Sequence, residues 1–172
     1  MECGAGFAFS LQKILIMDVV KKVALVAHDN CKKDLVEWVG WNWRLLLNHK
    51  LICTGTTGRL VEESIAKHLT KGQTMKYPIT KLKSGPLGGD QQLGAMIAEG
   101  EVDVLFFFWD PMQPHPHDVD VKALLRISVL YNVPTACNRS TADYMISSRL
   151  MNENYERKIT DYSSYTDRPL AP

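Results

Sequence analysis

The stretch Val23-Ala24-Leu25-Val26-Ala27-His28-Asp29 decides the fold. Its first five residues form an uninterrupted apolar run, which is typical of a β-strand covered on both faces. The following residues, 31–43, mix polar and apolar side chains as an amphipathic helix does. A buried strand followed by such a helix is the repeating unit of α/β proteins, so this stretch predicts a parallel sheet flanked by helices.

The same alternation continues along the chain. Further strands are predicted at 51–53, 102–109 and 133–137, and helices at 60–69, 91–99, 121–129 and 141–147. The polar, basic stretch 70–83 is interpreted as a surface excursion, and the tail from residue 152 has little pattern. We therefore expect a single-domain, three-layer α/β fold with a central, mostly parallel sheet over residues 21–172. Residues 1–20 are expected to be a poorly ordered extension or a vector remnant.

Composition and charge exclude several classes of protein. The formal net charge of +1 predicts no general attraction to nucleic acid or to an acidic membrane surface. A phosphorylated substrate would therefore have to be bound by individual groups at its site and not by the overall charge of the protein. The longest apolar run, 102–109, is too short to cross a bilayer, and residues 1–20 lack the pattern of a signal peptide. The four cysteines (Cys3, Cys31, Cys53, Cys137) are scattered, which fits a reducing cytoplasm.

Polar residues follow the predicted strands directly. They are His28-Asp29, the Thr54–Gly58 loop, Asp110-Pro111 and Asn138. Ligands of open α/β sheets bind at the carboxyl ends of the strands, where these loops meet. The sequence therefore predicts that these residues converge on one edge of the sheet.

The loop Thr54-Gly55-Thr56-Thr57-Gly58 supplies hydroxyls and backbone N–H groups at the start of a helix, which suits a phosphate. An ordinary strand-to-helix turn with a threonine N-cap is the alternative. Ser84-Gly85 offers a second set of small donors. Lys32 lies four residues after His28 and is either the cation for this phosphate or a solvated surface lysine.

Asp90 follows two glycines at a predicted helix start. It is either a carboxylate stabilised by the helix dipole or a general base that a ligand can approach closely. The segment 109–120 contributes His115, His117 and three aspartates. A metal site is unfavoured there, because the two histidines flank Pro116 without helical spacing or a distant third ligand. Proton transfer suits them better, although at least one of Asp118 and Asp120 is expected only to cap the next helix.

Taken together and in order, these motifs resemble the methylglyoxal synthase family. The matching strings are 24–29, 54–58, 84–92, 109–111, 116–118, 120–126 and Asn138 followed by Thr141-Ala142. Each string alone is weak, but the ordered set is specific and covers residues 23–147. The resemblance implies a flavodoxin-like fold, a homohexamer without metal or organic cofactor, and allosteric inhibition by phosphate. It implies a lyase that converts dihydroxyacetone phosphate to methylglyoxal and phosphate.

The resemblance also implies roles for single residues. Asp90 would be the catalytic base, His117 would lie against the substrate oxygens, and Asp120 and Asp29 would be supporting carboxylates, with Asp110 nearby. His28 would line the pocket. The phosphate would be held by six further residues: Lys32, Thr54, Thr56, Thr57, Ser84 and Gly85, with Gly55 between the threonines. Arg126 and Arg168 resemble residues tied to subunit contacts.

One rival remains at this point, and it is a regulatory phosphate- or nucleotide-binding module of the same fold. Such a module would keep the phosphate-binding loops without needing Asp90, His117 and Asp120, which are all present. The chain departs from the family pattern in residues 1–20 and in its tail. The connection between the two glycine motifs is also about ten residues longer than the family pattern, and the extra residues are expected within 70–83. None of these departures touches a motif that carries chemistry.

Overall fold

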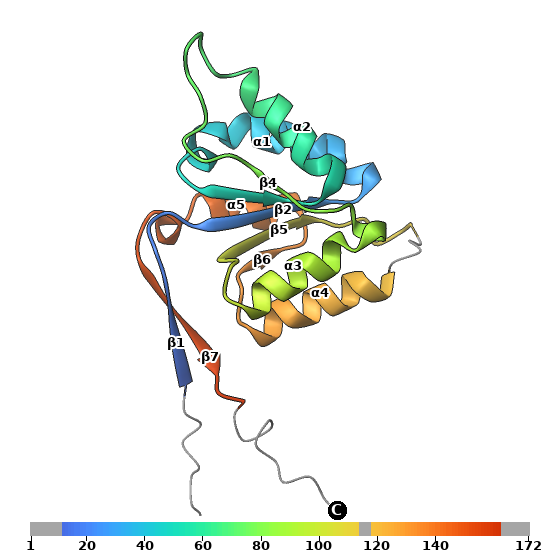
Figure 1. The fold of residues 1–172 in the computed structure, drawn as a ribbon, viewed down its shortest axis with the longest axis vertical. Helices are drawn as coiled ribbons and strands as arrows, with labels where there is room; N and C mark the ends of the chain where they lie inside the picture. The colour runs from blue at the N-terminus through green and yellow to red at the C-terminus, as the bar shows by residue number, and fades with distance from the viewer. Residues whose placement is uncertain (1–11, 114–117, 163–172) are drawn as a thin grey trace, which may run out of the picture.

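A five-stranded parallel sheet forms the centre of the molecule (Figure 1), a computed structural model that describes residues 12–113 and 118–162. From one edge to the other, the strands are β4 (Thr80–Lys81), β3 (Lys50–Cys53), β2 (Lys22–Ala27), β5 (Val104–Phe108) and β6 (Thr135–Ala136). Every neighbouring pair is parallel. The predicted central sheet is confirmed.

Helices cover both faces of this sheet. In Figure 1, α1 (Lys32–Leu46), α2 (Gly55–Ala66) and α5 (Arg139–Ile146) lie on one face, and α3 (Gly89–Ala98) and α4 (Asp118–Leu130) lie on the other. Three short 3-10 helices, η1 (Asp29–Cys31), η2 (Gly85–Leu87) and η3 (Arg149–Met151), occupy connections. The expected three-layer α/β fold is therefore confirmed.

The alternation of side chains along the strands divides the core into two layers. In β2, Val23 and Leu25 pack with α1 and α2, whereas Ala24 and Val26 pack with α3 and α4. Because both faces are covered, β2 reads as a continuous apolar run. Trp38 of α1 is fully buried with its ring 4.9 Å from that of Phe106 and 5.8 Å from that of Phe108.

The winding of the sheet reverses between β2 and β5. The chain runs outward from β2 through β3 to β4, returns along α3 to β5 and continues to β6. In order of appearance the strands therefore lie 3-2-1-4-5, whereas flavodoxin itself has the order 2-1-3-4-5. Such a sheet binds ligands at the carboxyl ends of the strands where the winding reverses, here beyond Ala27 and Phe108.

A separate two-stranded ribbon was missed by the sequence patterns. β1 (Gln12–Met17) pairs antiparallel with β7 (Tyr155–Thr160), with Ile14 opposite Lys158 (Figure 1). The expectation of poor order is therefore wrong for residues 12–17. The polar tail hides a strand because its inward positions, Arg157 and Ile159, are buried while their neighbours are exposed. The domain boundary at residue 21 stays a prediction.

Two connections also differ from expectation. The stretch 70–83 is not entirely an excursion, because Thr80-Lys81 forms the edge strand β4. A strand of two residues is too short to show a periodic pattern. The predicted Thr54–Gly58 loop is instead the beginning of α2, which starts at Gly55 rather than at residue 60. This difference matters, because it turns the threonines into the first turn of a helix.

Candidate active site

A cavity of about 420 Å³ lies at the carboxyl ends of the parallel strands. It contains Asp29, Asp90 and every described residue that was predicted to bind substrate. The lining residues are Val26, Ala27, His28, Asp29, Lys32, Thr54, Gly55, Thr56, Thr57, Ser84, Gly85, Pro86 and Asp90. Of the loops predicted to converge, His28-Asp29 and the segment after β3 meet at this cavity, whereas Asp110, Pro111 and Asn138 do not line it.

The first turn of α2 forms one wall of the cavity. Thr54 occupies the N-cap position in extended conformation, but its side chain accepts no hydrogen bond from its own helix. The N-cap alternative was therefore right about the position of Thr54 and wrong about the role of its side chain. Thr54 and Thr57 are almost completely buried and line the cavity, with Thr56 beside them. The first N–H groups of a helix have no partner within it, so this wall favours an anion.

Two helix starts press against the same backbone segment, Lys83–Ser84. Gly55 has φ of 34° and donates its N–H to the Lys83 carbonyl at 3.0 Å, and Gly89 donates to the Ser84 carbonyl at 3.0 Å. A Cβ on Gly55 would come within 2.6 Å of Ser84 Cα, and one on Gly89 within 2.0 Å of the Lys83 oxygen. Only glycine fits at both positions, so the two glycine motifs bring α2 and α3 to one place.

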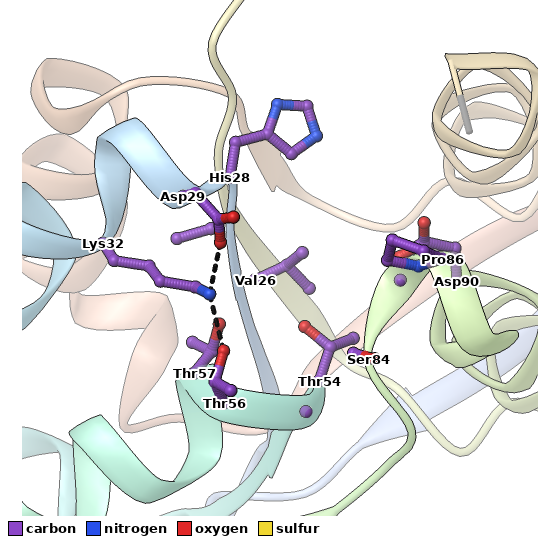
Figure 2. A pocket seen from close by; sticks show the side chains of 13 residues that line it. Val26, His28, Asp29, Lys32, Thr54, Thr56, Thr57, Ser84, Pro86 and Asp90 are labelled. Carbon is purple, nitrogen blue, oxygen red and sulfur yellow. Dashed lines mark hydrogen bonds and ion pairs between the residues drawn. The ribbon is translucent and has the colours of Figure 1, made fainter. Parts of the chain in front are cut away.

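Lys32 is held at the rim of the cavity by two partners. Its ammonium donates to Asp29 Oδ1 at 2.5 Å and to Thr56 Oγ1 at 2.5 Å (Figure 2). The Lys32 side chain is 23% exposed, whereas that of Asp29 is 85% exposed. The lysine is therefore not the solvated surface residue of the alternative interpretation, because it is positioned over the threonine turn.

Asp90 lies across the cavity from Lys32, in the first turn of α3 (Figure 2). Its exposed fraction is only 4%. The helix N-terminus stabilises negative charge at this position, as one of the two interpretations predicted. The other interpretation, a base that a ligand can approach, is also compatible with the geometry because Asp90 lines the cavity.

The orientation of His28 is set by a backbone donor. The Asp110 N–H donates to His28 Nδ1 at 3.2 Å, and the imidazole meets Phe107 edge-on at 5.1 Å between ring centroids. A backbone N–H cannot accept a hydrogen bond, so Nδ1 is the acceptor and the neutral ring carries its proton on Nε2. His28 is thus a fixed part of the cavity wall.

Asp110 lies in the loop after β5. Its Oδ1 accepts from the Met112 N–H at 2.9 Å, and it lines a neighbouring hollow of about 250 Å³ with Gln113. Asp110 therefore lies next to the cavity that His28 lines, and its backbone N–H is hydrogen-bonded to that histidine.

Several predicted residues are not brought to the cavity or are not described. Asp120 lies in the first turn of α4, half-buried, and does not line the cavity as the described residues form it. Asn138 caps α5 by accepting from the Thr141 N–H at 2.9 Å. His117 and Arg168 lie outside the described residues, so their roles stay predictions.

The cysteines near the site are not poised as nucleophiles. Burial raises the pKa of the Cys53 thiol to about 12, and burial, reinforced by Asp110 and Asp34, also raises the pKa of Cys31. A neutral thiol is a poor nucleophile. Within residues 12–113 and 118–162, His, Cys, Asp and Glu side chains form no group of three that suits a metal ion. No helix in these ranges is long and apolar enough to span a membrane.

Some residues of the site escaped the sequence analysis. Val26 and Pro86 line the cavity, one at a strand end and the other inside the second glycine motif, so both stand beside residues that the sequence does mark. Gln92 accepts from the Lys83 N–H at 2.8 Å, and Asn30 bonds across to the loop after β5. No local pattern marks these two contacts, because each joins segments that only the fold brings together.

Comparisons with known proteins agree with this geometry. Residues 35–137 match the family model described as the MGS-like domain. Methylglyoxal synthase of Maridesulfovibrio salexigens is 59% identical over 157 residues, which cover 90% of this chain and 100% of the relative. Methylglyoxal synthase of Coxiella burnetii is 50% identical over 149 residues, covering 87% and 97%.

A solved structure gives the same result. The crystal structure of methylglyoxal synthase from Elizabethkingia anophelis superimposes with a TM-score of 0.81 at 45% identity, covering 92% of this chain and 98% of that one. The fold, the cavity and these relatives lead to one conclusion: the chain belongs to the methylglyoxal synthase family.

Proposed function

We propose that the chain is a lyase that converts dihydroxyacetone phosphate to methylglyoxal and inorganic phosphate. The observation that carries the proposal is one cavity that joins a buried carboxylate, Asp90, to a cradle of hydroxyls, helix N–H groups and the Lys32 ammonium. Family membership supports the same reaction, because the relatives are named methylglyoxal synthase.

The first step is removal of a proton from the hydroxymethyl carbon beside the carbonyl. Asp90 takes this proton as general base, and an enediolate forms. A carboxylate is a weak base for a carbon acid, and positioned acid–base groups contribute only about 10²–10⁴-fold. The enediolate oxygen therefore needs hydrogen-bond donors as charge develops on it. Nε2–H of His28 is one candidate donor, and His117 is the donor that the family resemblance suggests.

The second step is departure of phosphate. The π electrons of the enediolate form a new double bond to the carbon bearing the phosphate, and the carbon–oxygen bond to phosphate breaks, so that phosphate leaves with the electrons of that bond. The hydroxyl on the deprotonated carbon becomes a carbonyl as its proton passes to the departing phosphate. Thr54, Thr56, Thr57, Ser84 and Gly85 bind its oxygens, with Gly55 supplying the turn and Lys32 neutralising the growing charge. The released enol then rearranges to methylglyoxal. Asp29, which holds Lys32 in the free protein, and Asp120 are assigned supporting roles.

The choice between elimination and isomerisation depends on geometry. Phosphate can leave only when its bond to carbon lies roughly perpendicular to the enediolate plane. The cradle binds the phosphate from α2 and η2 together with Lys32, and such a fixed arrangement sets that angle. We therefore expect methylglyoxal and phosphate in equal amounts, with little glyceraldehyde 3-phosphate.

The test is a proton NMR time course of dihydroxyacetone phosphate with the enzyme and a chelator. Methylglyoxal appearing in step with inorganic phosphate supports the proposal. Accumulation of glyceraldehyde 3-phosphate would make the chain an isomerase. An unchanged substrate would favour the regulatory phosphate- or nucleotide-binding module, which no observation on the described residues favours.

We further propose that the chain assembles as a homohexamer, is inhibited cooperatively by phosphate and works in the cytoplasm. The support is the family resemblance, together with the anion-favouring first turn of α2, which binds free phosphate by the same groups as the substrate phosphate. Light scattering that gives a monomer mass at micromolar concentration would contradict the assembly. Inhibition by phosphate with a Hill coefficient of one would contradict the cooperativity.

A further inference from the structure

Asn30 joins two loops at the edge of the cavity. It stands in η1, directly after β2, and its side-chain amide donates to Asp110 Oδ2 at 2.8 Å and to Gln113 Oε1 at 2.5 Å. Both partners belong to the loop after β5, 80 and 83 residues further along the chain. Asn30 itself is exposed and is not among the described residues that line the cavity.

The chemistry of this contact is specific for an amide. Asp110 Oδ2 and Gln113 Oε1 are both acceptors, so the group between them must supply two hydrogens. The –NH₂ of asparagine does so, and this requirement fixes which way the amide is turned. An aspartate of the same shape would place a third acceptor, with a negative charge, against the Asp110 carboxylate.

Asn30 is connected to the imidazole of His28 through Asp110. Asp110 is held on one side by Asn30 and on the other by the Met112 N–H, and its own N–H donates to His28 Nδ1. The position of that N–H decides which nitrogen of His28 carries the proton. His28 is one of the residues that line the cavity, so a shift of the loop after β5 changes the hydrogen bonding of a residue in the cavity wall.

We infer that Asn30 is a positioning residue for the reaction: it holds the loop after β5 so that Asp110 keeps His28 in the tautomer with Nε2 protonated. The inference rests on the proposed function, because it assigns His28 a donor role toward the enediolate. Asn30 touches neither the cavity nor the phosphate cradle, so its loss lowers kcat and leaves KM and phosphate affinity almost unchanged.

The test compares Asn30→Ala and Asn30→Asp with the full-length wild type. We expect kcat on dihydroxyacetone phosphate to fall about tenfold in Asn30→Ala, because small misplacements of reacting groups have effects of this order, and further in Asn30→Asp. Asn48→Ala is the matched control, since it removes an exposed asparagine amide that donates to the Arg44 carbonyl at 3.3 Å at the far end of α1. Its kcat is expected to equal that of the wild type.

A second readout does not depend on activity. Nitrogen-15 NMR of histidine-labelled protein reports which ring nitrogen is protonated, and the His28 signals are assigned by their loss in His28→Gln. The wild type is expected to show Nε2 protonated, and Asn30→Ala a mixture of tautomers or a charged ring at unchanged thermal stability. Unchanged His28 signals in Asn30→Ala overturn the inference, whether or not kcat falls. A wild type that does not turn over substrate overturns the proposed function, while the NMR comparison still decides the role of Asn30.

Discussion

The two ends of the parallel sheet both collect titratable side chains, but they use them differently. At the carboxyl ends, Asp90, His28 and Lys32 face a cavity of about 420 Å³. At the amino ends, Lys21 and Arg157 are completely buried, and Asp103 and His49 are nearly so.

The buried charged side chains at the amino ends donate hydrogen bonds to backbone carbonyls. The Lys21 ammonium donates to the carbonyls of Met17, Asp18 and Glu153, and Arg157 donates to the Val102 carbonyl at 3.0 Å. These contacts tie the β1–β7 ribbon to the sheet. Burial lowers the pKa of Lys21 and raises the pKa of Asp103, against the opposing charges of neighbouring groups.

The comparison teaches that charge near a sheet end has two different uses. Where the winding reverses and loops diverge, charged groups stay accessible to a ligand. Where a second element covers the sheet end, charged groups satisfy backbone carbonyls and stabilise the fold. Substitutions at the carboxyl ends should therefore change activity first, and substitutions at the amino ends should change stability first.

The largest effect is expected for Asp90→Asn. The change keeps the shape of the side chain and removes the base, so kcat should fall by about 10²–10⁴-fold while thermal stability and phosphate affinity stay near those of the wild type. Steady-state kinetics and a phosphate titration measure this directly. A variant that keeps more than about a tenth of the wild-type rate would exclude Asp90 as the base.

Gly89→Ala should damage both activity and stability, because its Cβ would meet the Lys83 carbonyl at 2.0 Å and force the two helix starts apart. Gly94→Ala is the matched control in the same helix, since nothing lies within 4 Å of the added methyl. The control should be stabilised by up to about 1 kcal/mol, because alanine is the better helix former. Thermal unfolding and kinetics of the pair test whether the close approach of α3 to Lys83 builds the cavity.

Lys21→Met should affect stability alone. It removes the donor from three backbone carbonyls, and we expect a loss of about 2–3 kcal/mol in the free energy of unfolding. Such a loss corresponds to a fall in Tm of about 2–4 °C per kcal/mol for a chain of this size. A changed kcat/KM in the folded variant would show that the two sheet ends are coupled, against the comparison.

The smallest effect is a pH dependence at His49. Its Nδ1 accepts from the Lys21 N–H at 3.2 Å, and burial, assisted by the charge of Lys21, lowers the pKa of its imidazole below 6.5. The folded state therefore holds this ring neutral more strongly than the unfolded state does. This stability is fully present above pH 6.5 and is lost as the pH falls from 6.5 through the folded-state pKa.

His49→Asn keeps an acceptor for the Lys21 N–H but does not titrate. Urea unfolding of both proteins at about pH 8 and about pH 5.5, on either side of the ordinary histidine pKa, should show a smaller loss of stability in the variant. Equal losses of stability in the wild type and the variant would mean that groups other than His49 determine the change between these two pH values. Asp103 acts with the opposite sign, because its raised pKa makes folding less favourable as the pH rises from 3.8 through the folded-state pKa.

Much of this protein follows from its sequence alone. The apolar runs and amphipathic segments determine the order of strands and helices, because burial on both faces of a strand and on one side of a helix leaves a local periodic signal. The parallel direction of the strands then determines at which end of the sheet the candidate site residues lie. In a parallel sheet every residue that follows a strand emerges at the same end, so the positions of His28, Thr54 and Asp110 in the chain suffice to place them together.

Tertiary structure decided the rest. The β1–β7 ribbon pairs Ile14 with Lys158, and β4 is only two residues long, so neither leaves a pattern that a short window of sequence can reveal. The contact of Gly89 with Lys83 and the bond from Asn30 to Asp110 likewise join segments that lie apart in the chain. Local sequence records what a segment buries, whereas the partner that it meets is selected by the packing of the whole chain.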